Sequence, residues 1–286
     1  MMGSPVALRP VAPIDVAGLF PEVGRELIAL LRSLAPEDWR RPTVCPAWTV
    51  KDVAAHLLDT ALRRLSFDRD RFAPPSPGRP IASPRDLVAF LNDLNAEWVA
   101  AFRRVSPAAL TDLLATIEPP LAAHLASVDP WAPALFPVAW AGESESLAWF
   151  DVARELTERW HHQQQIRLAV AAPPLDAPHL VEPVLETFLR ALPPRYAEVP
   201  APEGTAVAIR IEGKALYDFV LLRGETGWGL HRGHVSDPSA EIRMDGETAW
   251  LLLTKGLGGD EARAKAQIRG EESLVAPVFS TLAVMA

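Results

Sequence analysis

Two residues on one predicted helix have the types and the spacing of metal ligands. Glu158 and His162 are four positions apart, so their side chains lie on the same face of a helix, one turn apart. A catalytic zinc typically takes three protein ligands and leaves one position open for water or substrate. The third ligand must come from another segment. His56 is the best candidate, because it lies one or two turns into a well-capped helix, beside apolar Val53 and Leu57.

Each of these residues also has a simpler interpretation. Most Glu–His pairs at this spacing are solvated surface contacts, and a lone histidine near an apolar face is more often a hydrogen-bonded core residue. The surroundings of these residues favour a metal site. Trp149 and Trp160 flank Glu158 in the sequence and, like Trp48, are aromatic residues of a core or of a pocket wall. The three glutamines 163–165 offer hydrogen-bond partners for a ligand.

Four further polar residues lie near these three in the sequence. His161 points about 100° away from its neighbour on a helix, which favours a structural or supporting role. Glu155 could be a ligand, but a solvent-facing acid is the favoured interpretation. Asp59 follows His56 by three positions and could orient it. Cys45 precedes a helix start, where a thiol can have a lowered pKa, but no histidine is nearby and packing is favoured.

The elements that must position these residues are helices. Thr49 followed by Asp52 predicts a capping box at the start of the helix that carries His56. Apolar residues at helical spacing predict four long helices and one short helical segment, the latter followed by a loop rich in proline and aromatic residues. The long helices cover residues 15–34, 49–72, 83–105 and 144–170, and the short segment covers 107–114.

The pattern of apolar and polar residues changes after a Pro-rich linker at residues 172–178. One helix over 180–192 precedes alternating apolar and polar residues, which predict strands. The fold class is therefore α plus α+β, with a four-helix bundle over residues 13–172 and a smaller α+β domain over 178–286. The predicted strands are 206–212, 217–223, 228–231 and 241–244, and the last helices are 248–253, 261–266 and 273–284.

The composition excludes several classes of function. The net charge is −8 and no basic cluster is visible, which argues against a nucleic-acid partner. The single cysteine cannot form an internal disulfide. No apolar run has membrane-spanning length, and prolines interrupt the first 13 residues where a signal peptide needs a continuous apolar stretch. We expect a cytoplasmic protein without a membrane partner.

The segments that carry the candidate ligands resemble a known family. Its opening motif is matched by Thr43-Val-Cys-Pro-Ala-Trp-Thr-Val-Lys-Asp-Val-Ala-Ala-His-Leu, although Ala47 stands where the family usually has glycine. Its second motif, Glu-x-x-x-His, is matched by Glu158-Arg-Trp-His-His162. The family is the mycothiol-dependent maleylpyruvate isomerase N-terminal domain, of the DinB-like superfamily of four-helix metalloproteins. The resemblance covers about residues 13–172 and implies His56, Glu158 and His162 as metal ligands.

The second half resembles a sterol-carrier-like α+β domain, which isomerases of this family also carry. In the family, a basic residue of that domain reaches the metal cleft. Arg232, Arg243 and Lys255 are the candidates here for binding an anionic substrate or thiol, and Lys255 is chosen as the catalytic residue. His231 and His234 are interpreted as surface or turn residues. The matching segments are 211–214, 228–230, 237–242, 248–256 and 268–274.

The resemblance implies a metal-dependent enzyme that acts on a small-molecule substrate with a low-molecular-weight thiol. A thiolate would attack an electrophilic carbon, either as an isomerase or as a thiol S-transferase. Mycothiol, glutathione and bacillithiol are all compatible, and so are zinc, nickel, iron and manganese, with zinc favoured by two histidines and a glutamate. A binding protein for a hydrophobic or lipid-like ligand and a metal-dependent hydrolase are the alternatives. Monomer and homodimer are both open.

Overall fold

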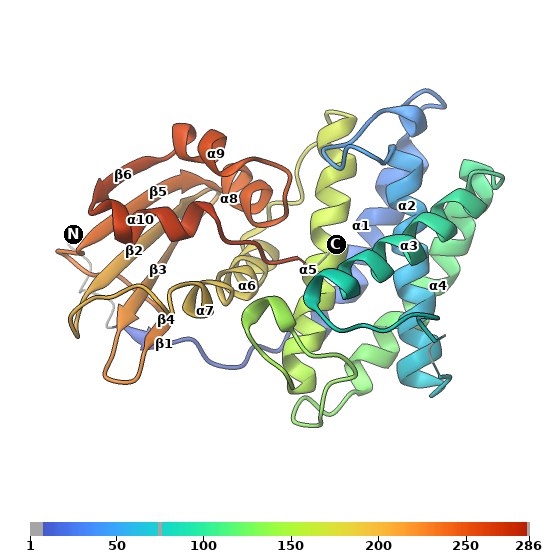
Figure 1. Ribbon diagram of the computed structural model, residues 1–286. Coiled ribbons are helices and arrows are strands. Elements are labelled where there is room, and N and C mark those ends of the chain that lie inside the picture. Colours follow the sequence, from blue (N-terminus) through green and yellow to red (C-terminus); the bar gives the residue numbers. More distant parts are fainter. Residues whose placement is uncertain (1–7, 74–75, 285–286) are drawn as a thin grey trace. The chain divides into compact units, whose positions relative to one another are not determined.

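The protein consists of two compact units. The computed structural model describes residues 8–73 and 76–284. One part, the helical unit, comprises residues 15–135 and 147–175, and the other, the sheet unit, comprises 8–14, 136–146 and 176–284 (Figure 1). The predicted class of α plus α+β is confirmed. The units differ from the predicted ranges of 13–172 and 178–286 mainly in residues 136–146, which belong to the sheet unit.

Four helices of the helical unit surround one apolar core. Helices α4 and α5 each pack against both α1 and α2, while α3 packs against α2. The core contains leucines of α1 and α4, the apolar face of α2 and Ile166 of α5. A π-helical turn, η3, continues α2 at Leu65–Arg69. The helices are α1 (Phe20–Ser33), α2 (Val50–Arg64), α3 (Pro84–Phe102), α4 (Pro107–Ser127) and α5 (Ala148–Ala169).

The sequence prediction for α4 is wrong. The expected helix over 107–114 continues to Ser127, and the expected Pro-rich loop begins only after it. Pro119 and Pro120 lie inside the helix, although a proline in a helix interior removes a hydrogen bond and costs about 3 kcal/mol. The helix continues because leucines on both sides of the prolines are buried against α1 and α2. These are Leu110, Leu114, Leu121 and Leu125.

The start of α2 follows the predicted capping box. The Thr49 side chain accepts the backbone N–H of Asp52, and the Asp52 carboxylate accepts the backbone N–H of Thr49 at 3.0 Å. Two backbone N–H groups at the helix start thereby have hydrogen-bond acceptors, which typically stabilises a helix by about 1 kcal/mol. The cap fixes where α2 begins, and with it the position of His56 two turns later.

The sheet unit is built on a six-stranded sheet with the order β1-β4-β3-β2-β5-β6. Strands β2 and β5 are parallel, and all other neighbours are antiparallel. Ile209, Ile211 and Met244 face side chains of four helices, which cover that side of the sheet. The strands are β1 (Arg9–Pro10), β2 (Ala206–Glu212), β3 (Leu216–Arg223), β4 (Trp228–Arg232), β5 (Ala240–Asp245) and β6 (Gln267–Gly270). The helices are α6 (Pro178–Leu189), α7 (Leu192–Arg195), α8 (Gly246–Leu253), α9 (Gly259–Lys265) and α10 (Glu272–Phe279).

Several segments of the sheet unit differ from the prediction. Residues 9–10, for which no strand was predicted, pair with β4, and residues 267–270 form edge strand β6, which was not predicted either. Both strands are short and largely exposed, so neither has the apolar alternation that reveals a strand in a sequence. Helix α10 ends at Phe279, short of the expected residue 284.

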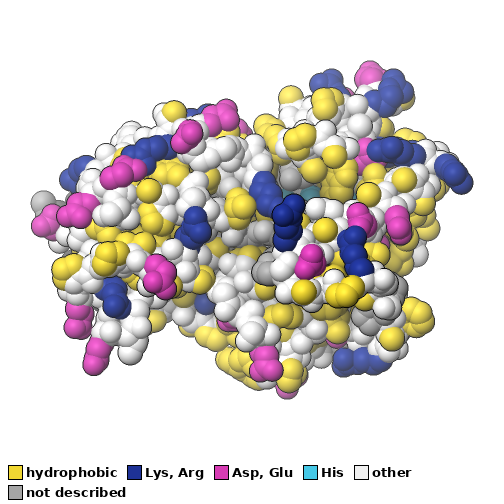
Figure 2. All heavy atoms as spheres, viewed as in Figure 1, with side chains coloured by type: hydrophobic (Ala, Val, Ile, Leu, Met, Phe, Trp, Pro, Cys, Tyr) yellow, Lys and Arg dark blue, Asp and Glu magenta, His cyan; other side chains and the backbone are white. Residues whose placement is uncertain are grey.

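The surface carries charges of both signs. On the face shown in Figure 2, Lys and Arg side chains are interspersed with Asp and Glu side chains, and hydrophobic side chains lie singly or in small groups. Among the helices of the described residues, none combines the length and the apolar character needed to cross a membrane.

Candidate metal centre

Helix α5 combines a polar sequence with a buried position. From Phe150 to Arg167, every residue is buried except Arg154 and Glu158, which are half-buried. Several of its polar side chains have partners inside the protein: Gln163 donates to the carbonyl of Val23 at 3.1 Å, and Gln164 accepts the backbone N–H of Leu175 at 2.9 Å. A helix that is polar and yet buried needs such partners, because an unsatisfied buried polar group costs about 1–3 kcal/mol.

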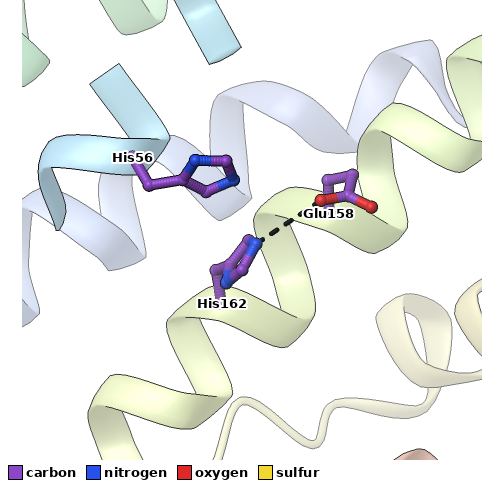
Figure 3. A group of neighbouring side chains, drawn as sticks. All are labelled: His56, Glu158 and His162. Carbon is purple, nitrogen blue, oxygen red and sulfur yellow. Dashed lines mark ion pairs between the residues drawn. The ribbon is translucent and has the colours of Figure 1, made fainter. Parts of the chain in front are cut away.

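The structure brings His56, Glu158 and His162 together. Glu158 and His162 lie on one face of α5, His56 reaches them from α2, and the three side chains point into the same space (Figure 3). One ligand atom from each lies within 4.8 Å of the other two. Nε2 of His162 is 3.4 Å from Oε2 of Glu158, and the rings of His56 and His162 are 4.8 Å apart, edge to face.

These residues fit a divalent cation in chemistry and spacing. Two ligands of a tetrahedral ion at about 2.1 Å lie about 3.4 Å from each other, which matches the separation of Nε2 of His162 and Oε2 of Glu158, 3.4 Å. Two imidazoles and one carboxylate are the ligand set of several catalytic zinc sites. Among the described residues, this is the one cluster of three or more His, Cys, Asp or Glu side chains that could hold an ion.

The protonation states of the cluster suit a cation. Burial lowers the pKa of His56 well below its usual value, and the nearby His162 lowers it further. Burial alone would raise the pKa of Glu158, but the hydrogen bond from His162, the two neighbouring histidines and Arg154 outweigh it and hold that pKa far below its usual range. At neutral pH, Glu158 is therefore charged and His56 is neutral, which are the forms that bind metal ions.

The two histidines are oriented by different contacts. Nδ1 of His162 is 2.9 Å from the side-chain oxygen of Gln165, so its Nε2 faces Glu158. Nδ1 of His56 is buried and makes no hydrogen bond with any described residue. Instead, the His56 ring packs on Trp48 at a centroid distance of 4.8 Å, and the same indole lies 6.2 Å from the His162 ring.

The loop before α2 holds Trp48 in that position. The Trp48 carbonyl accepts hydrogen bonds from the backbone N–H of Thr43 at 3.1 Å and from its hydroxyl at 2.9 Å. The backbone N–H of Trp48 donates to the carbonyl of Cys45 at 2.9 Å. Cys45 is half-buried in this turn. The hydrogen bonds of the turn fix its backbone and thereby hold the Trp48 side chain next to the cluster.

The expectation for Glu155 is wrong, and the possibility that Asp59 orients His56 is not realised. Glu155 is buried rather than solvent-facing, because its carboxylate lies 3.3 Å from the guanidinium of Arg64. Asp59 does not orient His56. It pairs with Arg63 at 2.9 Å, and burial raises its pKa to about 6 against the influence of that arginine.

His161 has the predicted supporting position. Its Nδ1 lies 2.8 Å from the carbonyl of Thr157, and its ring packs against His162 at a centroid distance of 4.1 Å. Burial, with a contribution from His162, lowers its pKa to about 3. Of the other flanking aromatic residues, Trp160 is buried and donates to the carbonyl of Leu175 at 2.9 Å, while Trp149 stacks on Phe150.

Most candidate cations and histidines of the sheet unit have partners within that unit. Arg232 pairs with Glu182 and Glu186, and Arg243 pairs with Glu212. His234 is exposed and contacts Arg210, which fits the interpretation as a surface or turn residue, whereas His231 lies half-buried in β4 with its ring against the carbonyl of Gly229.

Lys255 is exposed and lies just after α8. Its φ of 65° is in the left-handed region, and the next residue, Gly256, donates to the carbonyl of Leu251 at 2.8 Å. This is the Schellman motif that ends many helices, so Lys255 has a structural position of its own. Its predicted catalytic role stays a prediction.

Three residues of the centre have sequence signals that the predictions used only in part. Gln165 was one of three candidate partners, and its spacing of three residues from His162 places it over the same helix face. Arg154 is four residues before Glu158, on the face that carries the ligands, but all predicted basic site residues lie in the second half of the chain. Trp48 belongs to the motif before α2.

Comparison with solved structures identifies the same architecture elsewhere. The chain is similar to a crystal structure of mycothiol-dependent maleylpyruvate isomerase, with 13% identity, 89% of this chain and 92% of that chain covered, and a TM-score of 0.52. A histidine-to-alanine mutant of that enzyme gives the same values. A ubiquinone synthesis protein, UbiJ-SCP2, matches 35% of this chain and 84% of its own at 15% identity, and its TM-score of 0.25 is too low to bear on the fold.

Comparison with sequence families is more specific. No curated protein sequence matches the chain. The family model described as the mycothiol maleylpyruvate isomerase N-terminal domain matches residues 20–167, just over half of the 286 residues and the segment that contains all three clustered side chains. The chain therefore belongs to the family of the mycothiol maleylpyruvate isomerase N-terminal domain.

Proposed function

We propose that this protein is a metal-dependent enzyme that uses a low-molecular-weight thiol to modify a small electrophilic substrate. The observation that carries the proposal is the convergence of His56, Glu158 and His162 within 4.8 Å of one another in a helical unit. Membership in a family named for a mycothiol-dependent isomerase supports the thiol and the enzymatic role. We propose zinc as the metal and mycothiol as the thiol.

The side chains of the chain itself perform three tasks in this proposal. His56, Glu158 and His162 would hold the cation, and neither the neutral imidazole of His56 nor the charged carboxylate of Glu158 needs a deprotonation step at neutral pH. A cation held there supplies a Lewis-acid charge that favours the thiolate form of a bound thiol. Gln165 and Trp48 fix the two rings, and the indole restricts water on its side of the cluster.

Two reactions are consistent with this arrangement, and we propose the isomerase. In an isomerase, the thiolate adds to one carbon of a cis double bond, the new single bond rotates, and elimination returns the thiol with the trans product. In a thiol S-transferase, the same addition is not reversed and the thiol stays on the product. The family name favours the isomerase. Recovery of the thiol after turnover separates the two, because only the isomerase regenerates it.

The test begins with metal content. The wild-type protein and the variants His56→Ala and His162→Ala are purified and analysed for bound metal, with His179→Ala of α6, outside the cluster, as the matched control. We expect about one divalent ion per wild-type chain and per control chain, and a loss in both site variants. Unchanged metal in both site variants would contradict the site.

Activity then separates the thiol-using enzyme from a hydrolase. Turnover of a cis-configured unsaturated dicarboxylic acid is measured with and without the thiol. We expect turnover to require both the metal and the thiol. Metal-dependent hydrolysis without thiol would support an activated water instead, and a retained long-chain ligand in a metal-free protein would support a binding role.

A further inference from the structure

The half-buried residues in the middle of α5 lie in one row with the ligands of the metal centre. Between Phe150 and Arg167, only Arg154 and Glu158 are not buried. They are four positions apart and His162 follows four positions later, so the three side chains form one row along the helix. A molecule that reaches Glu158 along this row of half-buried residues therefore passes Arg154, one helical turn away.

Arg154 is anchored but retains free donors. Its Nε and Nη2 both donate to Oδ1 of Asp151, at 3.1 and 2.5 Å. Asp151 is shared, because it also accepts two hydrogen bonds from Arg64, at 2.7 and 3.1 Å. Nη1 of Arg154 makes no hydrogen bond with a described residue, and 21% of the side chain is exposed. The positive charge acts on the centre, since it is one of the groups that lower the pKa of Glu158.

We propose that Arg154 binds a carboxylate of the small molecule that occupies the metal centre and thereby selects anionic ligands. The proposal rests on the proposed function, because the ligand is the thiol or the electrophile of that reaction. A guanidinium offers a carboxylate paired donors in a fixed plane, and Asp151 holds this one in place before the ligand arrives. Residues one turn apart have Cβ atoms about 5–6 Å from each other, so a ligand with a few bonds between its reacting atom and its carboxylate spans both groups.

A purely structural role for Arg154 makes a different prediction. If Arg154 served only to hold Asp151, its removal would weaken acidic and neutral ligands equally. The discriminating quantity is therefore the ratio of affinities for a carboxylate and for its amide, and not the affinity for either one.

The experiment uses the full chain loaded with Co²⁺, which reports thiol binding through its sulfur-to-metal absorption band. N-acetylcysteine and N-acetylcysteine amide are titrated into the wild type, Arg154→Gln, Arg154→Lys and the control Arg25→Gln, an exposed arginine of α1. We expect the wild type and the control to bind the acid about tenfold more tightly than the amide, as one charge-assisted hydrogen bond implies. Arg154→Gln should lose the preference, and Arg154→Lys should keep part of it.

A second set of titrations tests whether Arg154 binds a carboxylate of the electrophile instead of one of the thiol. If the thiols show no preference in the wild type, succinate should compete with N-acetylcysteine amide in the wild type and not in Arg154→Gln, while succinamide should compete in neither. Equal behaviour of wild type and Arg154→Gln in both sets of titrations would overturn the proposal. A protein that binds no Co²⁺ would instead contradict the metal site and the proposed function.

Discussion

At the scale of single residues, the two histidines of the cluster depend on different neighbours. His162 has a hydrogen bond from its second ring nitrogen to Gln165, whereas the second ring nitrogen of His56 has no such partner among the described residues. Outer partners fix the ring orientation of a ligating histidine and raise its basicity, and their loss typically costs 10- to 100-fold in metal affinity. The two rings should therefore respond to different mutations.

The hydrogen bond gives the first prediction. Gln165→Ala should weaken metal binding roughly 10- to 100-fold, because the His162 ring loses the acceptor that sets its orientation. The affinity is measured by competition with a chromophoric chelator. Gln164→Ala is the matched control, since Gln164 is equally buried but its side-chain oxygen accepts the N–H of Leu175. Equal losses in the two variants would show that packing, and not the bond to His162, matters.

The ring contact gives the second prediction. Trp48→Ala should weaken metal binding about tenfold, because the His56 ring loses the surface that limits its rotation. Trp48→Phe should keep most of the affinity, because an aromatic ring remains next to His56. The same chelator competition measures both variants, with circular dichroism to verify the fold. Identical affinities of Trp48→Ala and wild type would exclude a positioning role for the indole.

At the scale of elements, buried ion pairs join α5 to α2 beside the cluster. Asp151 accepts two hydrogen bonds from Arg64 of α2, and both side chains are buried. Burial alone would raise the pKa of Asp151, but Arg154 and Arg64 lower it to about 2 from the ordinary 3.8. A carboxyl group whose pKa is lowered by folding stabilises the fold above its ordinary pKa, and this contribution fades as the pH falls towards the lowered value.

The third prediction follows from the direction of this pKa shift. As the pH falls from 5 to 2, Asp151 should contribute a loss of about 2 kcal/mol to the free energy of unfolding of the wild type. Asp151→Asn should be less stable at pH 7, since a buried ion pair is broken, but its stability should fall less on acidification. Urea unfolding at several pH values measures both. Parallel pH profiles would mean that Asp151 titrates normally in the folded protein.

At the scale of the whole molecule, the sequence predicts elements with strong periodicity and misses those set by tertiary contacts. The capping box of Thr49 and the spacing of Glu158 and His162 are local, and the structure reproduces both arrangements. Helix α4 crosses two prolines because its burial outweighs their cost, which no local rule reveals. Strand β6 forms at an exposed edge with Ile268 as its single large apolar residue, so its pairing with β5 is visible only in the assembled sheet.

In the metal centre, too, local spacing is visible in the sequence and tertiary contacts are not. Helical spacing joins Glu158 to His162, but 102 positions separate His56 from Glu158, and only the packing of α5 on α2 brings it within reach. The sequence motif, and not spacing, pointed to His56. The burial of Glu155 was misjudged, because it depends on Arg64 of α2, whose position beside α5 follows from the tertiary fold. The pair of Asp59 and Arg63, in contrast, is a local contact between residues four positions apart on α2.

The position of the cluster inside one unit leads to the fourth prediction. A metal ion that binds the folded state stabilises it by about 2.7 kcal/mol at 100 times its Kd. Because the ligands come from α2 and α5, Zn²⁺ should slow amide hydrogen exchange most in Val50–Arg64 and Ala148–Ala169. Exchange in β2 and β3 serves as the internal reference, since both strands belong to the sheet unit. Mass spectrometry of peptides with and without a chelator measures the difference.

His56→Ala should abolish the Zn²⁺ effect on both helices together, because an ion that has lost its α2 ligand no longer links α2 to α5. Protection that persists in α5 of this variant would show that Glu158 and His162 bind the ion without α2.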